Sequence, residues 1–178
     1  MNLLPIIRMG DPVLRLVAEP VADPACPLIG ALAEAMVEAM VAAPGVGLAA
    51  PQVGRSLRLI VMRLIADRSA ASEPIRAVAL VNPEFEPLDD ATEPGWEGCL
   101  SVPDMRGVVP RFTRIGDRGW LVDGRRVEGE ASGFQARILQ HEIDHLDGIT
   151  YLDRMTDLTT LGYAPEIAAA VRAADGQS

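Results

Sequence analysis

Both histidines of the chain lie within five residues, in the sequence His141-Glu142-Ile143-Asp144-His145. Ser132 followed by Gln135 predicts a capping box, so we expect a helix that begins there and ends by Gly148. Residues four apart lie on one face of a helix, one turn apart, so both imidazoles can bind the same metal ion. Glu142 is close enough to move a proton at such a site without being a ligand. The fold therefore has to bring a further ligand to this helix.

The third ligand has several candidates. A catalytic metal site of this type uses three protein ligands and leaves one position open for water. A downstream histidine is impossible because His145 is the last one in the chain. Glu166 follows His145 by 21 residues, near the spacing of thermolysin-like peptidases, and Cys99 lies upstream. A closed structural site in a binding protein, with Cys26 as a fourth ligand, is a further alternative.

The rest of the chain predicts an α+β fold, with antiparallel or mixed strands around the central helix that carries the two metal-binding histidines. We expect residues 1–178 to form a single catalytic domain. Apolar periodicity and turn residues predict the following elements: a helix over 28–42, strands over 57–65 and 77–82, a Pro-rich acidic loop over 83–95, a hairpin over 111–130 that turns at Asp123-Gly124, and a helix over 165–174.

The composition excludes several classes of function. All 16 basic residues are Arg, and the absence of Lys excludes Schiff-base chemistry and a Walker lysine. A net charge of −9 argues against direct nucleic-acid binding. The longest apolar stretch, 31–50, is interrupted by charged residues and Pro44, so we expect no membrane span. The N-terminal apolar run is broken by Pro5 and resembles no signal peptide, so we expect a cytoplasmic protein.

Three segments together resemble the peptide deformylases. They are Gly45-Val-Gly-Leu-Ala-Ala-Pro-Gln52, Glu97-Gly-Cys-Leu-Ser101 and Gln140-His-Glu-Ile-Asp-His-Leu-Asp-Gly148, and they occur in the order and spacing of that family. The similarity extends from about Leu4 to Arg154. The resemblance implies a metal-dependent hydrolase that removes the N-formyl group from the N-terminal methionine of newly synthesised polypeptides and releases formate.

The resemblance also implies a set of site residues. Cys99, His141 and His145 would bind one divalent metal ion, Fe²⁺ or Zn²⁺, for which Ni²⁺ or Co²⁺ could substitute. Glu142 would be the general acid and base, and Gln52 and the backbone N–H of Leu100 would stabilise the oxyanion. The family's substrate-binding positions correspond to Val46, Gly47, Glu97, Gly98, Phe134 and Ile138.

Supporting contacts and partners can be anticipated in the same way. An ion pair between Arg111 and Glu97, with Asp144 nearby, would support the ligands. The expected partners are N-formylmethionyl nascent peptides. Some family members dock on the ribosome through a basic C-terminal helix, but the tail after Thr156 contains Arg172 as its only basic residue. The sequence therefore gives little support for a ribosome contact of that kind.

Overall fold

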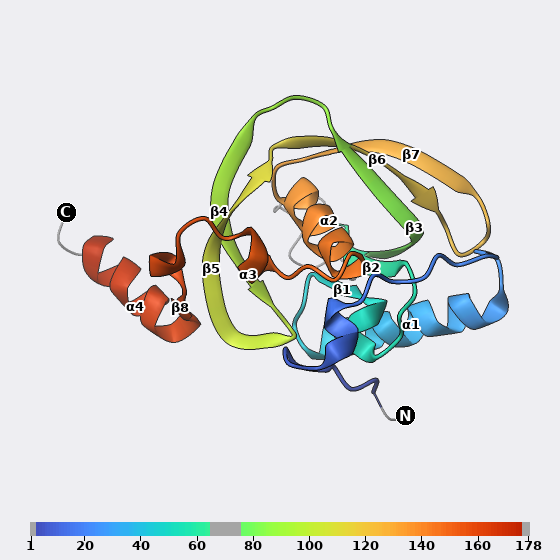
Figure 1. Cartoon of the computed structure of the whole chain (residues 1–178), viewed down its shortest axis with the longest axis horizontal. Helices are drawn as coiled ribbons and strands as arrows, with labels where there is room; N and C mark the ends of the chain where they lie inside the picture. Colours follow the sequence, from blue (N-terminus) through green and yellow to red (C-terminus); the bar gives the residue numbers. More distant parts are fainter. Residues whose placement is uncertain (1–2, 65–75, 176–178) are drawn as a thin grey trace.

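The computed structural model describes residues 3–64 and 76–175, in which two sheets surround one helix (Figure 1). The helices are α1 Pro27–Ala42, α2 Gly133–Leu146, α3 Tyr151–Arg154 and α4 Ala164–Asp175, with short 3-10 turns η1 Pro12–Arg15, η2 Ala50–Val53 and η3 Leu158–Thr160. The strands are β1 Gly47–Ala49, β2 Leu59–Arg63, β3 Ala77–Pro87, β4 Thr92–Cys99, β5 Val102–Phe112, β6 Arg114–Trp120, β7 Arg126–Ser132 and β8 Gly162–Tyr163.

One sheet has the strand order β1-β2-β3-β6-β7 and the other the order β4-β5-β8. All pairings between these strands are antiparallel. This arrangement confirms the predicted α+β class. It also leaves β1 and β4 each at the edge of a sheet, and a strand at an edge has backbone groups on one side that no neighbouring strand pairs.

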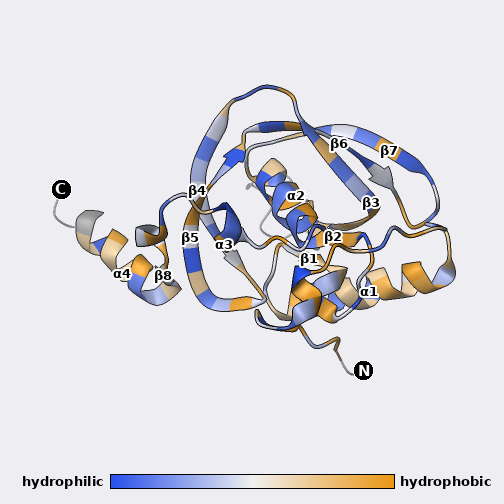
Figure 2. Ribbon diagram, in the orientation of Figure 1, coloured by the Kyte–Doolittle hydropathy of each residue, from blue (hydrophilic) through white to orange (hydrophobic). Residues whose placement is uncertain are grey.

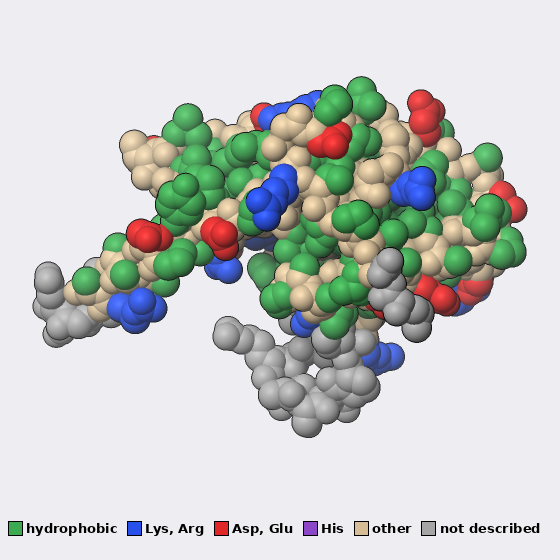
Figure 3. All heavy atoms as spheres, turned by 90° about the horizontal axis from the view of Figure 1, so that it is seen from below, with side chains coloured by type: hydrophobic (Ala, Val, Ile, Leu, Met, Phe, Trp, Pro, Cys, Tyr) green, Lys and Arg blue, Asp and Glu red, His purple; other side chains and the backbone are tan. Residues whose placement is uncertain are grey.

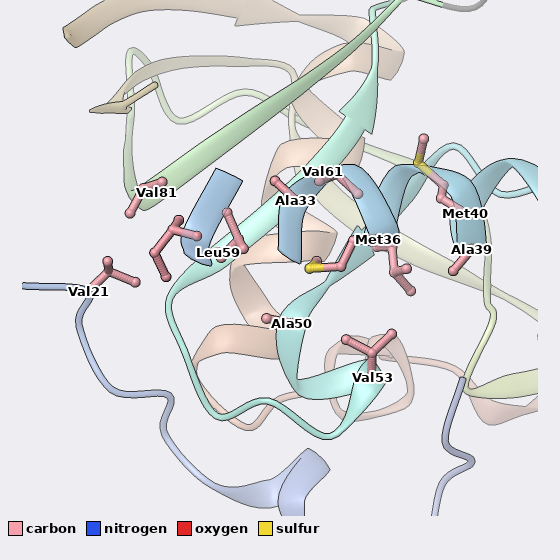
Figure 4. Close-up of a cluster of buried hydrophobic side chains, with 12 residues drawn as sticks. Val21, Ala33, Met36, Ala39, Met40, Ala50, Val53, Leu59, Val61 and Val81 are labelled. Atoms are coloured by element: carbon pink, nitrogen blue, oxygen red, sulfur yellow. The ribbon is translucent and has the colours of Figure 1, made fainter. Parts of the chain in front are cut away.

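Helix α1 agrees with its predicted range to within one residue, and it covers the first sheet. Pro27 occupies the first turn, where a missing N–H costs nothing. Its buried residues recur at helical spacing and pack on β1 and β2: Ile29, Ala33, Met36, Ala39 and Met40. Figure 4 shows this cluster, with Met36 and Met40 of the helix labelled. Figure 2 shows this helix as mainly hydrophobic. Glu34 and Glu38 are exposed, so α1 has a packing role and carries no ionisable group into the interior.

The predicted loop over 83–95 is wrong. Strand β3 continues to Pro87, and β4 already begins at Thr92. A register shift between Val81 and Glu84 accommodates Pro83, which has no N–H to donate to the ladder. Strand β4 lies at the edge of its sheet, where Pro94 is tolerated. Pairing with distant strands thus overrides the local loop signals of Pro and acidic residues.

Helix α2 has the predicted range, but its first turn differs from the prediction. Ser132 is the N-cap and makes no side-chain hydrogen bond to the start of the helix, so the capping box is wrong. Gln135 instead directs its amide to the Met62 sulfur at 3.2 Å. Ser132 is also the last residue of β7, and its extended conformation continues the strand into the helix. The helix ends before Gly148, whose φ of +71° favours glycine.

The other predicted elements are present with shifted ends. The strand predicted over 57–65 is β2, Leu59–Arg63, and residue 65 lies outside the described residues. The hairpin is β6–β7 around Asp123-Gly124, but residues 111 and 112 belong to β5. The C-terminal helix is α4, which projects from the side of β5 (Figure 1).

The distribution of surface charge and the length of the helices can be compared with the predictions of no direct nucleic-acid binding and no membrane span. On the face shown in Figure 3, acidic and basic side chains are dispersed and form no continuous basic patch. None of the described helices is long and apolar enough to cross a membrane.

Candidate active site

Helix α2 is buried on every side over its last turns, although much of that stretch is polar. The buried residues run without a break from Ile138 to Leu146 and include five polar ones: Gln140, His141, Glu142, Asp144 and His145. Buried polar groups cost free energy unless they are paired, so a fold retains them where they bind something or act chemically. This stretch of α2 is therefore the strongest candidate for a functional site.

The end of strand β4 lies against this stretch of the helix. His141 and His145 lie one turn apart, with ring centroids separated by 5.1 Å. Cys99 is the last residue of β4, and its Sγ lies 3.2 Å from His145 Nε2. One ligand atom from each of the three residues lies within 4.8 Å of the others. Among the described residues, this is the one group of Cys, His, Asp and Glu side chains that meets this criterion.

The chemistry of these three side chains fits a divalent metal ion. A thiolate and two imidazoles are the donor set that Zn²⁺, Fe²⁺ and similar ions prefer. His141 Nδ1 is bound to Glu97 Oε2 at 2.8 Å, which leaves Nε2 available as a ligand atom. Three protein ligands leave one coordination position open, as catalytic sites require. The residues present therefore fit a catalytic metal site better than a closed structural one.

The two alternative ligands lie elsewhere. Glu166 is exposed on α4, outside the ligand group. Cys26 is the residue before α1 and packs against the hydrophobic cluster beneath that helix. These positions are incompatible with a thermolysin-like metal site that uses Glu166 as its third ligand. They are also incompatible with a closed structural site that uses Cys26 as its fourth ligand.

Glu97 connects the candidate ligand His141 to the rest of the fold. Its carboxylate accepts hydrogen bonds from Arg111 Nε at 2.9 Å and Arg111 Nη2 at 3.1 Å. Arg111 Nη1 also donates to Asp144 Oδ2 at 2.6 Å, so the predicted ion pair and its neighbour are confirmed. Burial opposes ionisation of Glu97, but the hydrogen bonds from His141 and Arg111 lower its pKa to about 2. Glu97 therefore holds a fixed negative charge against His141.

Glu142 is buried beside the three candidate ligands, with 4% of its surface exposed. Its Oε2 is buried and has no hydrogen-bond partner among the described residues. Gly47 lies against the carboxyl group, and a side chain added there would overlap it. Burial raises the pKa of Glu142 to about 7, which is the range in which a carboxyl group can both accept and return a proton.

Gln52 is held so that its amide nitrogen faces Cys99. Gln52 Oε1 accepts a hydrogen bond from the Ala49 backbone N–H at 2.8 Å, which fixes the orientation of the amide. Its Nε2 lies 3.4 Å from Cys99 Sγ and 3.2 Å from Ser101 Oγ. Leu100 lies in the short turn between β4 and β5 and lines the same cavity. Gln52 Nε2 and the Leu100 backbone N–H are therefore candidate donors to a molecule bound in this cavity.

A cavity of about 550 Å³ opens over these groups. Its lining includes every predicted site residue except His145, namely Val46, Gly47, Gln52, Glu97, Gly98, Cys99, Leu100, Phe134, Ile138, His141 and Glu142. His145 lies beneath it, with 1% of its surface exposed. Trp96, Arg106 and Arg137 also line the cavity, but the sequence analysis did not predict them as site residues. Arg137 lies four residues before His141, and this helical spacing could have indicated it.

Comparison with known proteins agrees with this geometry. Residues 3–160 match the family described as polypeptide deformylase. The chain belongs to this family. It is 47% identical over 160 residues to peptide deformylase 2 of Ralstonia nicotianae, covering 89% of this chain and 90% of that one. It is 48% identical to peptide deformylase 1 of Bordetella pertussis over 159 residues, with the same shares covered.

Solved deformylases have the same fold. The crystal structure of peptide deformylase from Thermotoga maritima superposes with a TM-score of 0.78 at 39% identity, covering 88% of this chain and all of that one. The Met-Ala-Ser-bound class I type b peptide deformylase of Acinetobacter baumannii gives a TM-score of 0.77 at 39% identity, covering 86% and 99%. As a member of the deformylase family, the chain is a metal-dependent hydrolase that removes the formyl group from the N-terminal methionine of newly synthesised polypeptides.

Proposed function

We propose that Cys99, His141 and His145 hold one divalent metal ion and that Glu142 transfers protons in the deformylation reaction. One observation carries this assignment: a thiol and two imidazoles converge within 4.8 Å beside a buried carboxyl group, under a single cavity. We propose Fe²⁺ or Zn²⁺ as the native ion, with Ni²⁺ and Co²⁺ as substitutes, because all four suit this donor set. When bound, the ion would lower the pKa of a water molecule and polarise the formyl carbonyl.

The residues of the site would then transfer the proton, stabilise the oxyanion and orient His141. Glu142 accepts the proton of the attacking water and returns it to the amine that leaves. Negative charge develops on the formyl oxygen, where Gln52 Nε2 and the Leu100 N–H donate hydrogen bonds. Glu97 holds His141 in one orientation and one tautomer through Nδ1. The carbon–nitrogen bond breaks, and formate and a free N-terminal amine are the products.

The substrate chain has a suitable place to bind. The edge strands β1 and β4 both contribute lining residues to the cavity, Gly47 from β1 and Glu97 and Gly98 from β4. An extended peptide can add to such edges through backbone hydrogen bonds. Val46, Phe134 and Ile138 provide an apolar surface for the methionine side chain. We further propose that residues 1–178 act as one catalytic domain in the cytoplasm, with any ribosome contact made without a basic C-terminal helix.

Gln52→Leu tests the oxyanion role. The substitution keeps the size of the side chain but removes the donor, so we expect kcat to fall ~10²–10³-fold. KM should change much less, because the hydrogen bond strengthens mainly as charge develops in the transition state. Steady-state kinetics on a formyl-Met peptide measure both constants. An unchanged kcat would mean that Gln52 serves only to hold the turn at Ala49.

The substrate class is tested by comparing formyl-Met-Ala-Ser with acetyl-Met-Ala-Ser. This peptide suits the purpose because the Acinetobacter baumannii relative is described as bound to Met-Ala-Ser. A site fitted around the formyl hydrogen crowds a methyl group, so we expect rapid formate release and almost no acetate release under anaerobic conditions with metal supplied. Comparable rates on the two peptides, or no formate at all, would contradict the proposal.

A further inference from the structure

Arg137 is a partly buried cation of the cavity wall, and the reaction assigns it no role. Its side chain is 12% exposed, and its Nη1 donates to Glu97 Oε1 at 2.9 Å and to the Val109 carbonyl at 2.8 Å. Its Nη2 donates to the Glu93 carbonyl at 2.7 Å, and the Gly95 carbonyl lies 3.4 Å from Nη1. One side chain of α2 therefore binds both neighbouring strands, β4 and β5.

Arg137 and His141 reach the same carboxylate from the same helix. They lie four residues apart and so share one face of α2. Arg137 Nη1 binds Glu97 Oε1 at 2.9 Å, and His141 Nδ1 binds Glu97 Oε2 at 2.8 Å. Arg111 from β5 approaches both oxygens of the carboxylate as well. Each oxygen of Glu97 thus accepts two hydrogen bonds, and Arg137 adds a second bond between this carboxylate and α2, beside the bond from His141.

Arg137 also contacts several residues of β4, the strand that carries Cys99. Glu93, Gly95 and Glu97 are alternate residues of this strand, which ends at Cys99. Figure 1 shows β4 passing beside α2. Space for the guanidinium is left by Gly95, where an added Cβ would lie 2.7 Å from Arg137 Nη2. Arg137 therefore fastens the strand that ends at Cys99 to the helix that carries both histidines.

We propose that Arg137 is a positioning residue for the metal ligands: it holds Glu97, and through Glu97 His141, at a fixed distance from Cys99. This inference rests on the proposed ligand set. Removal of groups that orient metal ligands typically weakens metal binding ~10–100-fold. We expect a weakening of this size for Arg137→Met, which keeps the length of the side chain and removes its donors.

The experiment compares four variants of the full chain, Arg137→Met, Arg137→Lys, Gly95→Ala and Arg118→Met, and adds Cys99→Ala as a test of the ligand set. Zn²⁺ affinity is measured by competition with a chelator, the Co²⁺ protein is examined by visible absorption, and melting temperatures are recorded. Arg137→Lys should recover much of the metal affinity, because an ammonium group can still reach Glu97, although it cannot bind all the carbonyls. Gly95→Ala should weaken Zn²⁺ binding by displacing the guanidinium. Arg118→Met, which removes an exposed arginine paired with Glu84, is the matched control and should bind Zn²⁺ like the wild type.

The outcomes separate positioning from simple stabilisation. Lower metal affinity in Arg137→Met, recovery in Arg137→Lys and an altered Co²⁺ spectrum support the proposal. A lower melting temperature with unchanged Zn²⁺ affinity in Arg137→Met would overturn it, as would equal weakening in Arg118→Met. If Arg137→Met fails to fold, unchanged Zn²⁺ affinity in both Arg137→Lys and Gly95→Ala overturns it. Tight Zn²⁺ binding by Cys99→Ala would instead show that the ligand set itself is wrong.

Discussion

Glu142→Gln should retain its metal and lose nearly all of its activity. The amide has the size of the carboxylate, so it fits between Gly47 and the ligands without a clash. It cannot accept the proton of the attacking water, and loss of a general acid–base group typically costs ~10²–10⁴-fold in rate. We therefore expect a metal content equal to that of the wild type and a fall in kcat of this size. Metal analysis and formate release on the same preparation provide the two measurements.

A surface substitution provides the control for this result. Glu34→Gln makes the same chemical change on the exposed face of α1 and should affect neither quantity. Wild-type activity in Glu142→Gln would mean that another group moves the proton. Loss of metal together with activity would mean that Glu142 acts as a ligand or holds one in place.

The parts of the site that could be predicted from the sequence are those with local signals. The positions of His141, Glu142 and His145 follow from the helical spacing, and the end of α2 follows from Gly148, whose φ of +71° few other residues adopt. Cys99 was one of several candidate third ligands, and the resemblance to the family then selected it and gave Gln52 its role at the site. Local periodicity and one recognised family pattern together indicated the chemical groups of the site.

The parts that could not be predicted depend on contacts between distant residues. The segment 83–95 has the composition of a loop, yet only residues 88–91 lie outside a strand, because β6 and β5 pair with the rest. Arg137 was missed because its acceptor Glu97 lies 40 residues away on β4. Ser132 was correctly identified as the N-cap, but its side chain does not cap, because the residue also ends β7. Tertiary pairing decided each of these cases.

Cys99→Ala should lose both metal and activity. The substitution removes one of the three candidate ligands, and the remaining two histidines form a much weaker site. Glu166→Ala, which alters an exposed residue of α4, is the matched control because Glu166 would be the third ligand of a thermolysin-like site. We expect it to leave metal content and formate release unchanged. If Glu166→Ala lost its metal and Cys99→Ala kept all of its metal, the result would favour a thermolysin-like peptidase.

The proposed ligand set makes one metal ion, held by Cys99, His141 and His145, a requirement for formate release. The most direct measurement is an anaerobic titration of the metal-free chain with Fe²⁺ or Zn²⁺, following formate release from formyl-Met-Ala-Ser after each addition. We predict that activity rises in proportion to added metal, stops rising at one ion per chain, and stays near zero throughout for Cys99→Ala. Full activity without added metal, or an identical titration curve for Cys99→Ala, would contradict the account.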